Sequence, residues 1–145
     1  VEELYASVGR ISDLEIDVED SAEIILRFST GAVGSVHLDY YRRPGVHRME
    51  MVGSNGMLAW DNADGSVRLY QPETAGWEVF SAPEDFERNT LFLDEMSHFL
   101  DVASGKGSSV CTLQDGKRAL QLVLAAYRSS LEKRAVSGEA LYPQN

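Results

Sequence analysis

Hydrophobic and polar residues alternate along the first half of the chain, and this alternation predicts β-strands. Successive side chains of a strand point to opposite faces, so a period of two indicates a sheet with one face turned to a core. Between residues 22 and 61 the apolar positions on one parity are Ile24, Leu26, Phe28, Val36, Leu38 and Tyr40. Thr30-Gly31 and Asn55-Gly56 separate these runs. Asn-Gly is a strong hairpin signal because both residues tolerate positive φ, so an antiparallel meander is expected here.

Further strands are expected on both sides of this meander. Residues 1–11 alternate in the same way, whereas residues 12–20 are rich in Asp and Glu and predict an exposed loop or charged edge. A calcium loop is the alternative for that acidic stretch, but it lacks the glycine and ligand spacing of an EF-hand. Asp64-Gly65 predicts another turn, followed by strands at 66–70 and 77–80. Residues 135–141 could add a short last strand.

From residue 89 onward the apolar spacing changes to three and four, which predicts two helices. The first covers 89–103 and is ended by residues 104–107. The second begins after Thr112, which has Asp115 at the position of a capping box. Its main apolar stripe is Leu120, Val123, Leu124, Tyr127 and Leu131, and further apolar positions predict that it is the more buried helix. Strands followed by two helices predict an α+β fold: an open, mainly antiparallel sheet with two C-terminal helices packed on one face.

Length, charge and cysteine content limit the classes of protein to which this chain can belong. A chain of 145 residues is expected to form one domain. Its formal net charge is −10, which disfavours binding to nucleic acid. Cys111 is the sole cysteine, so an internal disulfide is excluded, and a buried structural thiol is expected. No apolar run approaches the roughly 20 residues of a membrane helix, and a cytoplasmic protein is expected. The start at Val1 without methionine suggests a piece of a longer protein.

Two short motifs have both a functional and a structural interpretation. Gly53-Ser54-Asn55-Gly56 resembles a nucleotide-binding loop, but a strand is expected on each side of it, so a hairpin is favoured. Glu95 and His98 have the spacing of two metal ligands on one helix face, but the chain offers one such motif where di-metal sites need two. A surface polar cluster that includes Asp101 is therefore favoured, and neither a metal site nor a catalytic nucleophile is predicted.

The stretch from Tyr41 to Arg48 gathers three arginines, a histidine and a tyrosine in an otherwise acidic chain. Pro44-Gly45 fixes a turn between two expected strands. Arginine side chains hold carboxylate or phosphate oxygens in bidentate geometry, so this stretch is a candidate anion clamp. The alternative is a set of arginines that pair with Asp39 and Glu50 on neighbouring strands.

The order of several segments resembles the C-terminal domain of the Gfo/Idh/MocA oxidoreductases. The segments are DSAEIILRFSTGAVGSV (20–36), MEMVGSNGMLAWD (49–61), FLDEMSHFLDVASG (92–105) and LQDGKRALQLVLAAYRSS (113–130). The resemblance covers nearly the whole chain. It implies a two-domain enzyme in which an N-terminal Rossmann domain binds NAD or NADP, and the present α+β domain shapes a substrate pocket and mediates oligomerisation.

The resemblance also implies what this chain does not contain. The family's acid/base residues belong to an E-K-P motif and a D-x-x-x-H motif, which the resemblance places upstream of Val1; Glu132-Lys133-Arg134 is not E-K-P. We therefore expect no catalytic residue and no cofactor-binding residue in this chain alone. The residues expected to contact a sugar-like substrate are Tyr41, Arg42, Arg43 and His47. This set of residues would suit an anionic sugar.

The resemblance also assigns a role to the second sheet face. Its mixed polar and apolar character suits packing against a second subunit, so a homo-oligomer is expected through Ile25, Arg27, His37, Asp39, Tyr41, Glu50 and Val52. The expected function is therefore the C-terminal domain of an NAD(P)-dependent dehydrogenase acting on a sugar, cyclitol or nucleotide-sugar hydroxyl. The alternative is a stand-alone, non-catalytic ligand-binding or dimerisation module.

Overall fold

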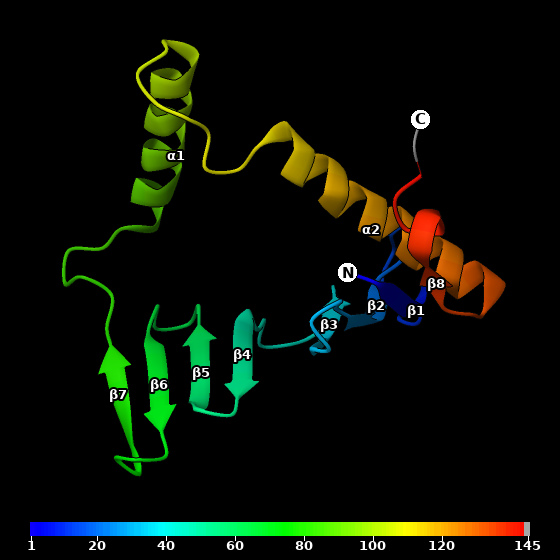
Figure 1. The fold of residues 1–145 in the computed structure, drawn as a ribbon, viewed down its shortest axis with the longest axis horizontal. Helices are drawn as coiled ribbons and strands as arrows, with labels where there is room; N and C mark the ends of the chain where they lie inside the picture. Colours follow the sequence, from blue (N-terminus) through cyan, green and yellow to red (C-terminus); the bar gives the residue numbers. More distant parts are fainter. Residues whose placement is uncertain (144–145) are drawn as a thin grey trace. The chain divides into compact units, whose positions relative to one another are not determined.

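A computed structural model describes residues 1–143, which contain eight β-strands, two α-helices and one short 3-10 helix (Figure 1). The chain divides into two compact units. The first unit comprises Val1–Tyr41 and the chain from Val110 onward, and the second unit comprises Arg42–Ser109. Each unit has its own four-stranded antiparallel sheet.

The sheet of the first unit has the order β3-β2-β1-β8. Its strands are β1 (Glu3–Gly9), β2 (Ser21–Arg27), β3 (Val33–Asp39) and β8 (Val136–Ser137). Leu4 lies opposite Leu26, and Ile24 lies opposite Val36, so the even-numbered apolar residues of β1–β3 share one face. The predicted alternation is confirmed on these strands.

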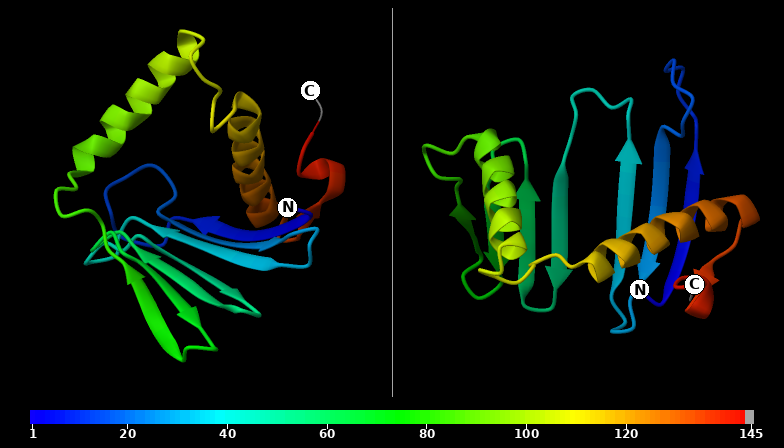
Figure 2. Two further views of the ribbon diagram at one scale, coloured as in Figure 1. Left: turned by 60° about the vertical axis from the view of Figure 1, so that its left-hand side comes forward. Right: turned by 90° about the horizontal axis from the view of Figure 1, so that it is seen from above.

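Helix α2 (Leu113–Glu132) packs on that apolar face and contacts β1 and β8 (Figure 2). Among residues 1–143, the buried apolar residues all lie in this unit: Leu4, Ala6, Ala125, Ala126, Val136 and Leu141. The buried face of α2 consists of Ala125, Ala126 and Ser129, whereas the predicted stripe from Leu120 to Leu131 is exposed. The predicted stripe was therefore wrong. Small side chains allow the helix to approach the sheet closely, and hydrophobicity alone does not reveal this.

Both ends of α2 follow from local sequence. Thr112 Oγ1 accepts a hydrogen bond from the Asp115 amide at 3.2 Å, and the Thr112 amide donates to Asp115 Oδ2 at 3.0 Å. This is the predicted capping box. The helix ends at Lys133, which has a left-handed backbone with φ 53°. The 3-10 helix η1 (Gly138–Ala140) follows β8.

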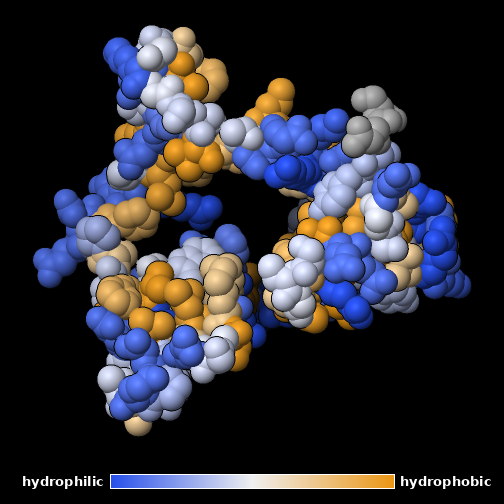
Figure 3. Space-filling model, viewed as in Figure 1, coloured by the Kyte–Doolittle hydropathy of each residue, from blue (hydrophilic) through white to orange (hydrophobic). Residues whose placement is uncertain are grey.

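The second unit has the sheet order β4-β5-β6-β7 and helix α1 (Arg88–Ala103). Its strands are β4 (Arg48–Gly53), β5 (Gly56–Asp61), β6 (Val67–Gln71) and β7 (Gly76–Phe80). Each strand pairs with the next in sequence, as expected for a meander. Hydrophobic side chains are exposed on β4, β7 and α1, and none of the residues of α1 is buried (Figure 3).

The open α+β class predicted from the sequence is confirmed, and its strands form two sheets. Of the two helices, α2 is the more buried, as predicted. Within residues 1–143, neither helix has the length and apolar character needed to cross a bilayer.

Candidate functional site

The predicted substrate-binding residues lie in the connection between β3 and β4. This connection, residues 40–47, contains no helix or strand and includes a cis peptide bond between Arg43 and Pro44. Arg42, Arg43 and His47 are exposed, and Tyr41 is 36% exposed. The expected strand–turn–strand arrangement is therefore present.

The division between the two units falls inside this stretch. Tyr41 belongs to the first unit, where its hydroxyl lies 3.5 Å from Ser21 Oγ. Arg42, Arg43 and His47 belong to the second unit. There, Arg43 Nη1 donates to the Arg42 carbonyl at 2.8 Å.

His47 has a structural environment within the second unit. Its ring packs edge-on against Trp60, with 4.8 Å between the ring centroids. Its carbonyl accepts a hydrogen bond from the Asn62 amide at 2.9 Å. Sequence spacing gave no sign of this contact, because Trp60 reaches His47 through the β4–β5 pairing.

A cavity of about 290 Å³ lies beside Tyr41 in the first unit. It lies where the ends of β1, β2 and β3 meet Tyr127 of α2, and Ser21, the neighbour of Tyr41, belongs to its wall. Its lining residues are Val8, Glu19, Asp20, Ser21, Ala22, Leu38, Asp39, Tyr40 and Tyr127. Of these, only Asp39 was predicted to have a functional role, as an interface residue, with pairing to an arginine as the alternative. Tyr127 was placed in the helix stripe, yet it is 45% exposed.

Asp20 fixes the acidic loop at one wall of this cavity. Its carboxylate accepts hydrogen bonds from the Ile11 amide at 2.8 Å, the Ser12 amide at 3.0 Å and the Ser12 hydroxyl at 2.5 Å. The Ser12 hydroxyl bond and the two amide bonds lower the pKa of Asp20 below its ordinary value. Its carbonyl also accepts from the Tyr40 amide at 3.0 Å. Asp20 is therefore a positioning residue for the cavity wall.

Tyr127 connects α2 to the same loop. Its hydroxyl donates to Glu19 Oε2 at 3.0 Å, and this bond raises the pKa of the Tyr127 phenol. The phenol therefore remains protonated at neutral pH. The lining includes Glu19, whose carboxylate accepts the Tyr127 hydroxyl, and the two tyrosines Tyr40 and Tyr127. Such a wall suits a ligand that donates hydrogen bonds from hydroxyl groups.

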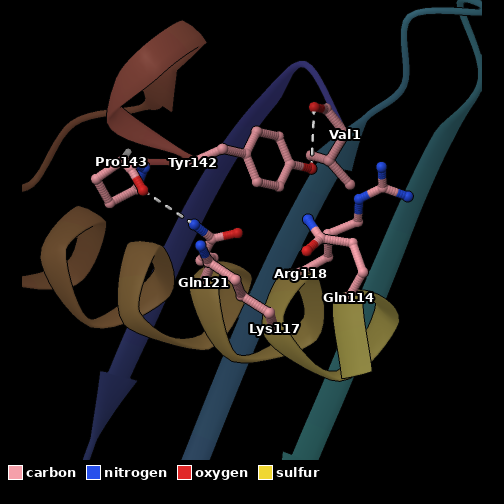
Figure 4. A pocket seen from close by; sticks show the side chains of 7 residues that line it. All are labelled: Val1, Gln114, Lys117, Arg118, Gln121, Tyr142 and Pro143. Carbon is pink, nitrogen blue, oxygen red and sulfur yellow. Dashed lines mark hydrogen bonds between the residues drawn. The ribbon is translucent and has the colours of Figure 1, made fainter. Parts of the chain in front are cut away.

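A second hollow, of about 510 Å³, lies along α2 in the same unit (Figure 4). Gln114, Lys117, Arg118 and Gln121 project from the helix on one side, and Val1, Tyr142 and Pro143 line the other. Gln121 Nε2 donates to the Pro143 carbonyl at 3.2 Å, and the Tyr142 hydroxyl donates to the Val1 carbonyl at 3.2 Å. None of the predicted site residues lines this hollow.

The face of the first sheet opposite α2, here called the open face, carries the odd-numbered residues of β1–β3. It includes four of the residues predicted for a subunit interface: Ile25, Arg27, His37 and Asp39. Ile25 is 53% exposed, and Arg27 lies 3.8 Å from Glu3. The predicted residues Glu50 and Val52 lie on β4 in the second unit and are exposed.

The remaining motifs have structural roles. Gly53–Gly56 forms the β4–β5 hairpin, as predicted. Glu95 and His98 are exposed on α1, and residues 1–143 contain no group of three His, Cys, Asp or Glu side chains arranged to hold a metal. Cys111 is exposed, so the expectation of a buried thiol was wrong. It stands in the extended segment before the Thr112 cap, where Val110 and Leu113 are exposed as well.

Comparison with known proteins identifies the family. Residues 2–137 match the family model for the C-terminal alpha/beta domain of the Gfo/Idh/MocA oxidoreductase family. The chain belongs to this family, as predicted from its segments.

Individual relatives agree with this assignment. The chain is 34% identical over 148 residues to myo-inositol 2-dehydrogenase of Thermotoga maritima, a match that covers 96% of this chain and 43% of that protein. The chain thus spans less than half the length of this curated relative.

Two solved structures have the same fold. An oxidoreductase from Agrobacterium radiobacter, in complex with NAD+, L-tartaric acid and magnesium, has a TM-score of 0.78 at 23% identity, with 94% of this chain and 43% of that chain covered. Levoglucosan dehydrogenase in complex with NADH has a TM-score of 0.81 at 16% identity, with 94% and 44% covered.

Proposed function

We propose that this chain is the C-terminal domain of an NAD(P)-dependent dehydrogenase that acts on a sugar, cyclitol or nucleotide-sugar hydroxyl. The observation that carries the proposal is the family match over residues 2–137. The relative at 34% identity is a myo-inositol dehydrogenase, which agrees with a polyhydroxylated substrate. In this proposal the chain is one domain of a cytoplasmic two-domain enzyme that binds neither nucleic acid nor membranes.

The cofactor, NAD or NADP, would be held by an upstream domain. Every described strand pairing is antiparallel, and the Gly53–Gly56 turn joins two strands. A dinucleotide site needs a glycine-rich turn between a parallel strand and a helix, so residues 1–143 do not fit this cofactor by themselves. The contribution of this chain is to bind and orient the substrate.

One candidate for the substrate wall is the cavity beside Tyr41, which lies within the first unit. The carboxylate of Glu19 would accept hydrogen bonds from substrate hydroxyls, and the ring faces of Tyr40 and Tyr127 would contact its carbon skeleton. The residues predicted from the sequence are a separate proposal: Tyr41, Arg42, Arg43 and His47 would contact a sugar-like, anionic substrate. The open face is proposed as the surface for a homo-oligomer.

The first experiment is intact-mass spectrometry of the native protein, followed by an assay of NAD or NADP reduction with a panel of polyols. A native chain more than twice 16.0 kDa that reduces the cofactor supports the proposal. A native chain near 16.0 kDa without activity overturns it and supports a stand-alone binding or dimerisation module.

The second experiment tests the arginines in the active native enzyme. Arg42→Ala and Arg43→Ala are expected to raise KM for the substrate and leave KM for the cofactor unchanged. Arg88→Ala, at the exposed start of α1, is the matched control. Unchanged substrate kinetics in both variants would remove this stretch from the site.

A further inference from the structure

The hollow along α2 has a cationic wall (Figure 4). The helix residues that line it are three or four positions apart and therefore share one face of α2: Gln114, Lys117, Arg118 and Gln121. Among the described residues that line the hollow, two carry a positive charge and none has a carboxylate side chain. This wall differs from the chain as a whole, whose formal net charge is −10.

Neither cation is held in a close ion pair. Within residues 1–143, Lys117 forms no ion pair. Arg118 Nη1 lies 4.0 Å from Asp115 Oδ1, which is too long for a charged hydrogen bond. The other carboxylate oxygen, Asp115 Oδ2, accepts the Thr112 amide at 3.0 Å and the Thr112 hydroxyl at 2.6 Å. The N–H donors of both cations can therefore bind a ligand.

The opposite wall is formed by the end of the described chain and by its first residue. Leu141 is fully buried and anchors this segment in the core. The Tyr142 hydroxyl donates to the Val1 carbonyl at 3.2 Å, and Gln121 Nε2 donates to the Pro143 carbonyl at 3.2 Å. These bonds hold the rings of Tyr142 and Pro143 at the hollow, where they add apolar surface to the polar helix wall.

We propose that this hollow binds a phosphate monoester. Its phosphoryl group is bound by Lys117 and Arg118, because arginine presents a fork of N–H donors that matches phosphoryl oxygens and lysine adds a point charge. The Gln114 amide on the same helix face can donate a further hydrogen bond. The organic part lies against Tyr142 and Pro143. The volume of about 510 Å³ is typical of a site for a small organic molecule.

The position of the hollow makes this ligand additional to the proposed substrate and cofactor. The hollow and the cavity beside Tyr41 share no lining residue. The inference therefore does not depend on the proposed dehydrogenase activity. A phosphate is favoured over a carboxylate because three phosphoryl oxygens can contact both cations and an amide, whereas a carboxylate offers two oxygens.

Isothermal titration calorimetry of the native-length protein with phenyl phosphate tests the inference. Lys117→Gln and Arg118→Gln are each expected to raise Kd for phenyl phosphate by about 3- to 10-fold, the effect of one exposed charge–charge contact. Arg128→Gln is the matched control, because it removes one positive charge from the same helix outside the hollow. It should leave Kd unchanged.

Two further titrations test the class of ligand. Tyr142→Leu removes the ring from the organic wall, so it should weaken the binding of phenyl phosphate and leave the weaker binding of inorganic phosphate unchanged. Benzoate, which carries a carboxylate on the same ring, should bind less tightly than phenyl phosphate. Benzoate of equal affinity would overturn the assignment to phosphate.

The site itself is overturned by any of three results. The first is no binding of phenyl phosphate to the wild-type protein at millimolar concentration. The second is an unchanged Kd in both Lys117→Gln and Arg118→Gln, which would place the bound phosphate elsewhere. The third is an equal loss of affinity in Arg128→Gln, which would show that only the overall charge matters.

Discussion

The Ala6 amide donates a hydrogen bond to the hydroxyl of Ser129 at 2.9 Å, although the two residues are 123 positions apart in sequence. Ser129 is fully buried, and its hydroxyl in turn donates to the Arg134 carbonyl at 2.7 Å. Strand β8 pairs with β1 only at Glu3 and Leu4 and does not extend as far as Ala6. The Ser129 hydroxyl therefore accepts the Ala6 amide, in place of the partner that a longer β8 would have provided. One side chain thus joins the strand, the helix and the turn that follows the helix.

Ser129→Ala is expected to destabilise the first unit. The variant leaves the Ala6 amide and the Arg134 carbonyl without this buried partner, and an unsatisfied buried polar group costs about 1–3 kcal/mol. The free energy of unfolding in urea should fall by that amount. Ser97→Ala, on exposed α1, controls for the loss of a hydroxyl from a helix. Equal stability of the two variants would show that the Ser129 bonds contribute nothing net.

Asp20→Asn is expected to make stability less dependent on pH in the acid range. The lowered pKa of Asp20 means that its carboxylate stabilises the fold at every pH above the ordinary value of 3.8. That stabilisation is lost as the pH falls through the folded-state value. The asparagine variant should be less stable than wild type at pH 7, and the difference should shrink as the medium is acidified below pH 3.8.

Urea unfolding at a series of pH values measures this difference. Asp13→Asn, on the exposed part of the same loop, provides the control for the loss of one negative charge. A constant gap between wild type and Asp20→Asn down to the most acidic pH would contradict the role assigned to the Asp20 carboxylate.

Strands and helices could be predicted because each depends on a short pattern. Alternation located β1–β3, Asn55-Gly56 located a hairpin, and Thr112 with Asp115 located the start of α2. Each of these patterns spans only a few residues, so it can be recognised without knowledge of the tertiary structure.

The contacts between distant segments could not be predicted in this way. Ala125, Ala126 and Ser129 form the buried face of α2 because small side chains allow close packing, whereas hydrophobicity favoured the larger Leu124 and Leu131. The cavity joins Glu19 to Tyr127 across 108 positions, and no pattern in the sequence links them. Tyr41 was predicted as a site residue because it stands in an unusual local cluster of arginines and a histidine. Its position beside the cavity depends on the tertiary structure and could not be predicted from the sequence.

Gly56→Ala is expected to disrupt the second sheet. Gly56 has φ +148°, and a Cβ built there would lie 2.2 Å from the Tyr70 carbonyl oxygen. Backbone strain of this kind costs about 1–3 kcal/mol, and the backbone of β6 would have to move as well. The urea midpoint of the second unit should fall, and amide exchange in β5 and β6 should become faster.

Gly53→Ala is the matched control in the same hairpin, because its Cβ would meet the nearest atom, the Gly56 carbonyl oxygen, at 3.9 Å. It should leave amide exchange close to wild type. Equal effects of the two substitutions would contradict the steric role assigned to Gly56.

Tyr127→Phe is expected to weaken substrate binding if the cavity beside Tyr41 forms part of the substrate pocket. The change removes the hydroxyl that donates to Glu19 at 3.0 Å and leaves the ring in place. Glu19 would lose the partner that orients its carboxylate toward the cavity wall. KM for the substrate in the native enzyme should rise by about 2- to 10-fold, the equivalent of one hydrogen bond, while KM for the cofactor stays unchanged.

Tyr5→Phe makes the same chemical change on the open face, away from the cavity, and should leave both constants unaltered. An unchanged substrate KM in Tyr127→Phe, with Glu19→Gln also silent, would exclude this cavity from the pocket and leave Arg42 and Arg43 as the residues to test.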